Sequence, residues 1–298
     1  MTRLNVPAKL RVFGLLWLLA AGACWPAKAE TFRIAALPDQ ATFDKYELGL
    51  LQVAISALPG EHEVVIVPFD YNQGRALRAL EAGTAPFDVY PTGYDVSREK
   101  RLRMVRFPLT RGLLGYRMLV ILESSRQRFE TIKTMDQLQA QITFGSGATW
   151  PDTPILRQAG FKVVTGTVHQ LWGMLRNGRF IAFPRGMQEV FRDLALESSS
   201  DDTDPFVIEP NFLISYRFDE FFYLNTRDEH KAALIEEGLK AAFREGTLDA
   251  YFHGHPDIVA AFAELKAHPR RIFRIENQQQ GVDIQNVPED YWIDIKLK

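Results

Sequence analysis

The sequence predicts a secreted α/β protein, and three features carry this prediction. The first 29 residues read as an export signal. After Glu30, short β-branched or aromatic runs alternate with helical patterns, which is typical of parallel sheets flanked by helices. The chain of 298 residues is long enough to be held together by a hydrophobic core.

Residues 1–29 have the three parts of a signal peptide. Arg3, Lys9 and Arg11 form a positive region, residues 12–23 are an apolar run, and residues 27–29 offer small side chains to a peptidase. The apolar run is shorter than the roughly 20 residues that cross a bilayer. We therefore expect cleavage after Ala29 and a soluble mature protein in the periplasm.

Cys24, the only cysteine, leaves one alternative open. It follows Ala21-Gly22-Ala23, which looks like a degenerate lipoprotein box, but we favour cleavage at Ala29 over lipidation at Cys24. On either reading the mature chain forms no disulfide of its own, unlike small secreted domains.

The net charge of the mature chain limits the class of partner that it can bind. The leader holds four of the 35 basic residues and none of the 37 acidic ones, which leaves a net charge near −6. A mildly acidic protein argues against a nucleic-acid partner. We expect a monomer whose partners are a small-molecule ligand and a membrane permease or membrane sensor.

The first half of the chain predicts a strand–helix–strand–helix–strand unit. Strands are expected at 32–37, 64–69 and 87–90. The first helix has apolar residues at helical spacing from Leu48 to Leu58 and stops at Pro59-Gly60, and the second covers 74–82 and ends at Gly83.

A second α/β unit follows the long apolar run 118–122. Thr134 is expected to cap a helix over 135–140. Further elements are expected in the order strand 142–144, helix 154–159, strand 162–164, helix 169–177 and strand 180–183. Extended segments at 206–209 and 215–224 lead back to a helix over 229–245.

The order of these parts resembles bacterial solute-binding protein family 3, which has the type II periplasmic binding protein fold. The segments that carry the resemblance are 115–120 (GYRMLV), 132–138 (IKTMDQL), 234–239 (LIEEGL) and 246–251 (GTLDAY). Together they cover essentially all of 30–252.

The resemblance implies two lobes, each a mostly parallel sheet flanked by helices, joined by two hinge strands near 113–118 and 210–215. Lobe 1 would comprise 30–114 and 213–298, and lobe 2 would comprise 115–212. A small, carboxylate-bearing solute would be captured between the lobes for uptake by an ABC-type transporter through a membrane permease.

Arg101 is the first candidate for a ligand contact. Residues 97–107 resemble the family segment Thr-x-x-Arg followed six residues later by Phe, with Arg101 in the place of the arginine that grips a carboxylate. A guanidinium suits that role because it donates two parallel hydrogen bonds. The alternative is that this basic run is a solvated face.

Ala148 and Thr149 are the next candidates. Residues 144–153 join a strand to a helix, so their backbone N–H groups could bind an anion. In the family the corresponding Gly-x-Thr turn binds the ligand carboxylate, and Ala148-Thr149 match it. An ordinary strand–helix connection is the alternative reading.

Arg185 departs from the family pattern. Residues 178–186 resemble the family's Gly-x-x-Asp-Ala strand, after which amino-acid binders carry an aspartate for the ligand ammonium, and Arg185 stands at that site. An arginine attracts an anion there, so the ligand would carry two acidic groups or lack an amine. Alternatively, Arg185 points away or pairs with Glu189.

Aromatic residues beside the strand ends are expected to supply the apolar part of a pocket, with Tyr71 and Trp150 preferred. We expect no cofactor and no metal, since His253 and His255 lack further ligands nearby. We also expect no enzyme, because the sequence has no Gly-x-Ser-x-Gly elbow. A ligand sensor that signals to a membrane partner is the main alternative, and a periplasmic enzyme on this fold is a weaker one.

Overall fold

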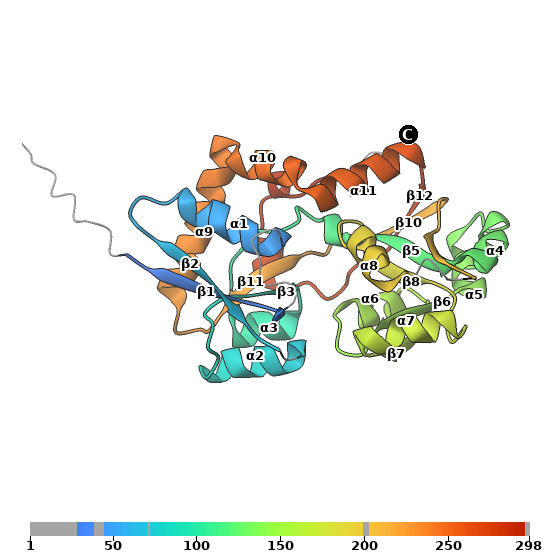
Figure 1. Ribbon diagram of the computed structural model, residues 1–298, viewed down its shortest axis with the longest axis horizontal. Coiled ribbons are helices and arrows are strands. Elements are labelled where there is room, and N and C mark those ends of the chain that lie inside the picture. The colour runs from blue at the N-terminus through green and yellow to red at the C-terminus, as the bar shows by residue number, and fades with distance from the viewer. Residues whose placement is uncertain (1–28, 39–44, 71, 199–202, 296–298) are drawn as a thin grey trace, which may run out of the picture.

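The computed structural model describes residues 29–38, 45–70, 72–198 and 203–295 (Figure 1). The expected signal peptide lies outside them except for its last residue, and so does Cys24. Within the described part of the chain, no helix is long and apolar enough to cross a membrane.

The first lobe contains two groups of strands and the helices around them. Its strands are β1 (Thr31–Ala36), β2 (Glu63–Pro68), β3 (Tyr90–Gly93), β4 (Arg103–Met104) and β11 (Glu220–Leu224). Its helices are α1 (Tyr46–Ser56), α2 (Gln73–Ala82), α3 (Val96–Arg101), α9 (Glu229–Glu245) and α10 (Thr247–Gly254). β1 and β2 pair in parallel, and β11 lies between β3 and β4.

The second lobe is built around the long strand β5. Its strands are β5 (Tyr116–Leu122), β6 (Thr143–Gly147), β7 (Lys162–Gly166), β8 (Phe183–Gly186), β9 (Phe206–Ile208), β10 (Phe212–Ser215) and β12 (Arg271–Arg274). Its helices are α4 (Arg126–Glu130), α5 (Met135–Gln141), α6 (Asp152–Gln158), α7 (Val168–Arg176) and α8 (Val190–Glu197). β12, β10, β5 and β8 follow one another across one sheet.

The α/β architecture is confirmed, but the sheets are more mixed than expected. β6 and β7 pair in parallel, whereas β5 pairs antiparallel with β8, β9 and β10. β11 also runs antiparallel to β3 and β4. The crossing strand β5 and the returning strand β11 run against the direction of their neighbours, so antiparallel pairs occur beside the parallel pairs β1–β2, β6–β7 and β10–β12.

Local sequence signals explain several of the element ends. The expected cap at Thr134 is present as a capping box with Gln137. Asn72 caps α2 by accepting a hydrogen bond from the backbone N–H of Arg75, and Gly83 ends the helix with φ +69°. The helix expected over 229–245 matches α9 at both ends.

Close packing of α1 against α9 builds the core of the first lobe. Leu48, Leu51 and Ile55 of α1 are buried, and so are Ile235 and Leu239 of α9. At Gly238 the helices approach so closely that an added Cβ would overlap the backbone carbonyl of Ala54. Neither helix can yield without moving backbone, which makes this glycine a packing requirement.

Gly238→Ala should therefore lower the free energy of unfolding by about 1–3 kcal/mol, as overpacking does. Gly173→Ala in α7 is the matched control, because its added Cβ meets nothing within 4 Å. That control should be neutral or stabilising by up to about 1 kcal/mol. Urea unfolding of both variants makes the comparison, and equal stability of the two would contradict the packing argument.

The lobes are joined by crossing segments at residues 105–115 and 216–219, between the strands of the two lobes. The second crossing lies later than the expected 210–215, because β10 hydrogen-bonds to β5 and so belongs to the sheet of the second lobe. β12 joins the same sheet beside β10. The expected boundary at residue 213 leaves both strands in the first lobe, whereas their pairing extends the second.

Asp219 ties these two crossings together. Its fully buried carboxylate accepts hydrogen bonds from the backbone N–H groups of Thr110 (3.0 Å), Gly112 (2.7 Å) and Glu220 (2.8 Å), and from the Thr110 hydroxyl (2.6 Å). Burial raises the pKa of Asp219 to about 7.

Further connections run along the outside of the hinge. Helix α11 (Pro256–Ala267) leads from α10 to β12 along the upper side of both lobes (Figure 1). After β12 the chain returns through α12 (Val282–Gln285) and a short 3₁₀ turn (Glu289–Tyr291). There Tyr291 packs on Phe107 and on Phe243 of α9, so this turn rests on the first lobe.

Asp219 gives stability a defined pH dependence. An unfolded aspartate titrates near 3.9, so between about pH 4 and pH 7 the folded protein keeps a proton that the unfolded chain has released. The contribution of Asp219 to the free energy of unfolding should thus fall by roughly 3 kcal/mol as the pH rises through this window. Urea unfolding at pH 4.5–7.5 should show this slope in the wild type, with a flatter profile for Asp219→Asn. Parallel profiles would contradict the assignment.

Candidate functional site

A cavity of about 720 Å³ lies between the lobes and is lined by both of them. The first lobe contributes the end of β1, Lys45, residues 69–70 after β2, the first two residues of β3 and the start of α2. The second lobe contributes residues 147–150 after β6 and 166–169 between β7 and α7. Ligands of open α/β sheets bind at such carboxyl ends of strands, so this cavity is the candidate site.

The first-lobe wall carries a hydrogen-bonded amide. Gln73, the first residue of α2, lines the cavity and donates from Nε2 to the Thr92 hydroxyl at 2.7 Å. Tyr90 lines the same wall, and burial raises the pKa of its hydroxyl to about 12, so it stays protonated at neutral pH. Gln73 and Tyr90 therefore present neutral polar groups and an aromatic ring to the cavity.

Arg98 lies directly behind this wall. Its guanidinium donates to the Thr92 hydroxyl (3.0 Å), to the Gly93 carbonyl and to the Gln73 side-chain oxygen (2.9 Å). The residue is 6% exposed, and no carboxylate among the described residues forms an ion pair with it. Burial lowers the pKa of Arg98. This direction is expected for a buried cation whose hydrogen-bond acceptors are neutral.

Arg101, the arginine expected from the sequence spacing, lies elsewhere. Its side chain is 47% exposed, pairs with Glu81 of α2 at 2.7 Å and does not line the cavity. The helix explains the difference, because Asp95 caps α3 and places Arg98 on its inner side, one turn before Arg101. The six-residue spacing to Phe107, which led to the prediction of Arg101, therefore points to an arginine on the outer surface.

The second-lobe wall is centred on Trp150. Residues 147–150 all line the cavity, as do Gly166 and Thr167 across the next loop. Gly147 lets the indole lie against the backbone, since a Cβ there would overlap the ring. The Ala148 N–H already donates to the Gly166 carbonyl at 3.0 Å, so it is not available to an anion, while the exposed side of Thr149 faces the cavity.

Arg185 supports this wall from behind. It is buried, pairs with Asp193 at 2.6 Å and Glu189 at 3.2 Å, and does not line the cavity. Burial alone would lower the pKa of Arg185, but the two carboxylates raise it. Its guanidinium lies 5.0 Å from the centre of the Trp150 ring. A direct contact between Arg185 and a ligand is therefore not the arrangement seen, and the alternative pairing with Glu189 is present.

Of the two aromatic residues preferred from the sequence, Trp150 lines the cavity and Tyr71 lies outside the described residues. Phe69 and Tyr90 supply further aromatic surface on the opposite wall. The cavity thus has aromatic side chains on both lobes.

The charges at the cavity are mainly basic. Lys45 and Arg75 line it, together with the imidazole ring of His169, against Asp70 as the one acidic lining residue in the described part of the chain. Asp70 and Arg75 are exposed, whereas Lys45 is half-buried and lies 3.7 Å from Glu47. The lining therefore carries a small excess of basic over acidic side chains.

Sequence reasoning missed Gln73, Arg98, Lys45 and the 166–169 loop. For Arg98, the sequence did contain a signal in Asp95. An aspartate is a typical N-cap residue, so Asp95 predicts where α3 starts and thereby on which side of the helix Arg98 lies. No comparable signal marked the other three.

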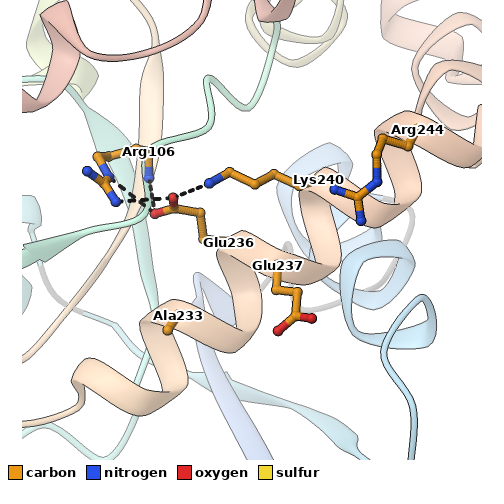
Figure 2. A pocket seen from close by; sticks show the side chains of 6 residues that line it. All are labelled: Arg106, Ala233, Glu236, Glu237, Lys240 and Arg244. Carbon is orange, nitrogen blue, oxygen red and sulfur yellow. Dashed lines mark hydrogen bonds and ion pairs between the residues drawn. The ribbon is translucent and has the colours of Figure 1, made fainter.

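A second hollow, on the outside of α9, is not a comparable site. Figure 2 shows Glu236 between Arg106 and Lys240, with which it pairs at 3.4 and 2.6 Å. Its volume is about 340 Å³, and its lining comes from α9 and Arg106 alone. Glu236 is already paired with both cations, and no second-lobe residue lines this hollow.

The described residues contain no group of three or more His, Cys, Asp or Glu side chains placed to hold a metal ion. His255, one of the pair considered in the sequence, is buried and caps α11 by accepting from the Asp257 N–H. Its role is structural.

No protein-family model matches the sequence, and no curated protein matches it either. Solved structures do match. The probable amino-acid ABC transporter extracellular-binding protein ytmK of Bacillus subtilis has a TM-score of 0.55 at 15% identity, over 77% of this chain and 99% of that one. An ancestral arginine-binding protein bound to glutamine has a TM-score of 0.53 at 14% identity, over 76% and 98%.

A third match is the GluR0 ligand-binding core of Nostoc punctiforme in complex with L-glutamate, with a TM-score of 0.50 at 11% identity, over 76% and 99%. At such low identities the likeness concerns the fold. These neighbours are binding proteins or ligand-binding cores rather than enzymes. The chain has the two-lobed fold of type II periplasmic binding proteins, as its resemblance to the family 3 solute-binding proteins implied.

Proposed function

We propose that this protein is a periplasmic solute-binding protein that captures a small anionic solute between its lobes and delivers it to an ABC-type permease. The observation that carries the proposal is the cavity shared by both lobes, with Arg98 behind its first-lobe wall as a buried cation that forms no ion pair with any carboxylate of the described residues. Export and uptake fit the leader predicted from the sequence.

The electrostatic argument starts from the cost of burying Arg98. A buried charge is expensive unless an opposite charge or several hydrogen bonds compensate it. Here three neutral acceptors hold the guanidinium. An anion in the cavity would add the missing opposite charge in a site of low dielectric, where the attraction is strong.

The apolar part of the solute would lie between aromatic side chains of the two lobes. Trp150 on one wall faces the cavity that Phe69 and Tyr90 line from the other. Aromatic walls with a few placed polar groups are the common composition of small-molecule sites. We expect Thr149 and Trp150 to contact the solute, while Ala148 would contribute only its exposed methyl group.

The solute need not be an amino acid. The neighbours bound to glutamine and to L-glutamate hold ligands with an ammonium group. At the position where the family resemblance places an aspartate for that group, this chain has Arg185, which pairs with Asp193 and Glu189. We therefore expect acids to bind more tightly than cationic amino acids.

A panel of probes tests the charge preference. Succinate, phenylacetate, L-glutamate, L-glutamine, L-arginine and L-lysine would be titrated calorimetrically into the mature protein. At least one acid should bind more tightly than either cationic amino acid. Tighter binding of arginine or lysine would overturn the anionic part of the proposal, and binding of none would leave solute capture unsupported.

Arg98→Met tests the residue behind the wall. It removes the charge but keeps an apolar stem, so affinity for the tightest-binding acid should fall at least about tenfold, as expected for loss of a buried charge partner. The melting temperature without ligand should fall, because the oxygens of Thr92, Gly93 and Gln73 lose their donor, so affinities are compared at a temperature where both proteins are folded. Arg101→Met is the matched control and should change affinity less than about twofold, as is typical of exposed pairs. Equal effects of both variants would refute the assignment to Arg98.

A further inference from the structure

The C-terminal segment, defined here as Ile275–Ile295, joins the second lobe to the first. It begins beside β10, where the Ile275 N–H donates to the Ser215 carbonyl at 2.9 Å. It then passes the second crossing, where the Asn277 side chain donates to the Arg217 carbonyl at 3.0 Å. Its last residues bind the first crossing, with Ile293 N–H donating to the Arg111 carbonyl at 2.8 Å.

In between, the C-terminal segment makes a set of hydrogen bonds to the start of α3. The Gly281 N–H donates to the Tyr94 hydroxyl at 2.6 Å, and that hydroxyl donates to the Glu99 carboxylate at 2.6 Å. The Asp283 N–H donates to the other Glu99 oxygen at 3.1 Å. Glu99 is therefore fastened to the C-terminal segment from two sides.

Glu99 and Arg98 are neighbours on a very short helix. Helix α3 has six residues, too few to be stable without outside contacts. Arg98 anchors its inner side to Thr92, Gly93 and Gln73, and Glu99 anchors its outer side to the C-terminal segment. The position of the Arg98 guanidinium thus depends on contacts at both sides of the helix.

We propose that the C-terminal segment positions Arg98 for solute binding through Glu99. Glu99 and Gly281 act as positioning residues, since neither lines the cavity. The C-terminal segment starts on the sheet of the second lobe, so a movement of that lobe would also displace α3. Displacement of α3 would shift the Arg98 guanidinium and so change the electrostatic field at the cavity. The inference rests on the proposed function, in which Arg98 attracts the solute.

Substitutions on this route can be made without disturbing the core. A Cβ at Gly281 would overlap the Glu99 carboxylate and lie 2.6 Å from the Tyr94 hydroxyl, which are the ends of side chains rather than backbone. Gly281→Ala therefore displaces Glu99 while the chain can still fold. Gly254→Ala is the control, since its added Cβ meets nothing within 4 Å.

The test measures affinity for the tightest-binding acid of the panel, together with melting temperature without ligand. Glu99→Ala and Gly281→Ala should each weaken binding about threefold to tenfold, the size of coupling between residues in one hydrogen-bond network. Glu99→Gln retains an acceptor for the Asp283 N–H and should restore most of the affinity. Gly254→Ala should not change it.

A double-mutant cycle separates positioning from general damage. If Glu99 acts through Arg98, Glu99→Ala should have no further effect on affinity in the Arg98→Met background. Full additivity of the two losses, or an unchanged affinity in Glu99→Ala and Gly281→Ala while Arg98→Met weakens binding, would overturn the inference and leave the proposed function standing. An unchanged affinity in Arg98→Met itself, or no binding by any panel member, would overturn both.

Discussion

The arrangement of the whole molecule depends on the buried carboxylate of Asp219. Two segments far apart in sequence cross between the lobes, and three donors of the first crossing converge on this one side chain of the second. Gly115 allows the crossings to touch, since a Cβ there would overlap the Tyr216 carbonyl. The junction is therefore narrow and strongly hydrogen-bonded, which keeps the ends of strands in both lobes facing one cavity.

The buried arginines near the two walls of that cavity differ in the charge of their hydrogen-bond partners. In the second lobe, Arg117 pairs with Asp152, and Arg185 pairs with Glu189 and Asp193, so each cation is neutralised inside the lobe. In the first lobe, Arg98 has neutral acceptors only among its hydrogen-bond partners. A protein selected for stability alone would pair or replace such a residue, because an uncompensated buried charge costs free energy. The imbalance is understandable if the opposite charge arrives with a ligand.

The sequence predicted the elements well where local physics decides them. Apolar spacing fixed α9, and a capping box fixed the start of α5. It failed where a side chain's direction depends on where a helix begins. Arg98 and Arg101 lie one turn apart in a run of basic residues, and only the Asp95 cap orients them. The partners of Arg185 lie on and just before α8, which the sequence reading had not assigned as a helix.

The return of the chain after β12 could not be read from the sequence, because its contacts are tertiary. Gly281, Asp283 and Glu99 show no pattern in sequence, since 182 positions separate Glu99 from Gly281, yet they form one hydrogen-bonded group. Hydrogen bonds of this kind contribute about 1 kcal/mol each, too little to hold the lobes against a hinge motion. They are large enough, however, to shift the position of a six-residue helix whose own stability is marginal. The C-terminal segment is thus better suited to adjusting the charge behind the cavity wall than to locking the lobes.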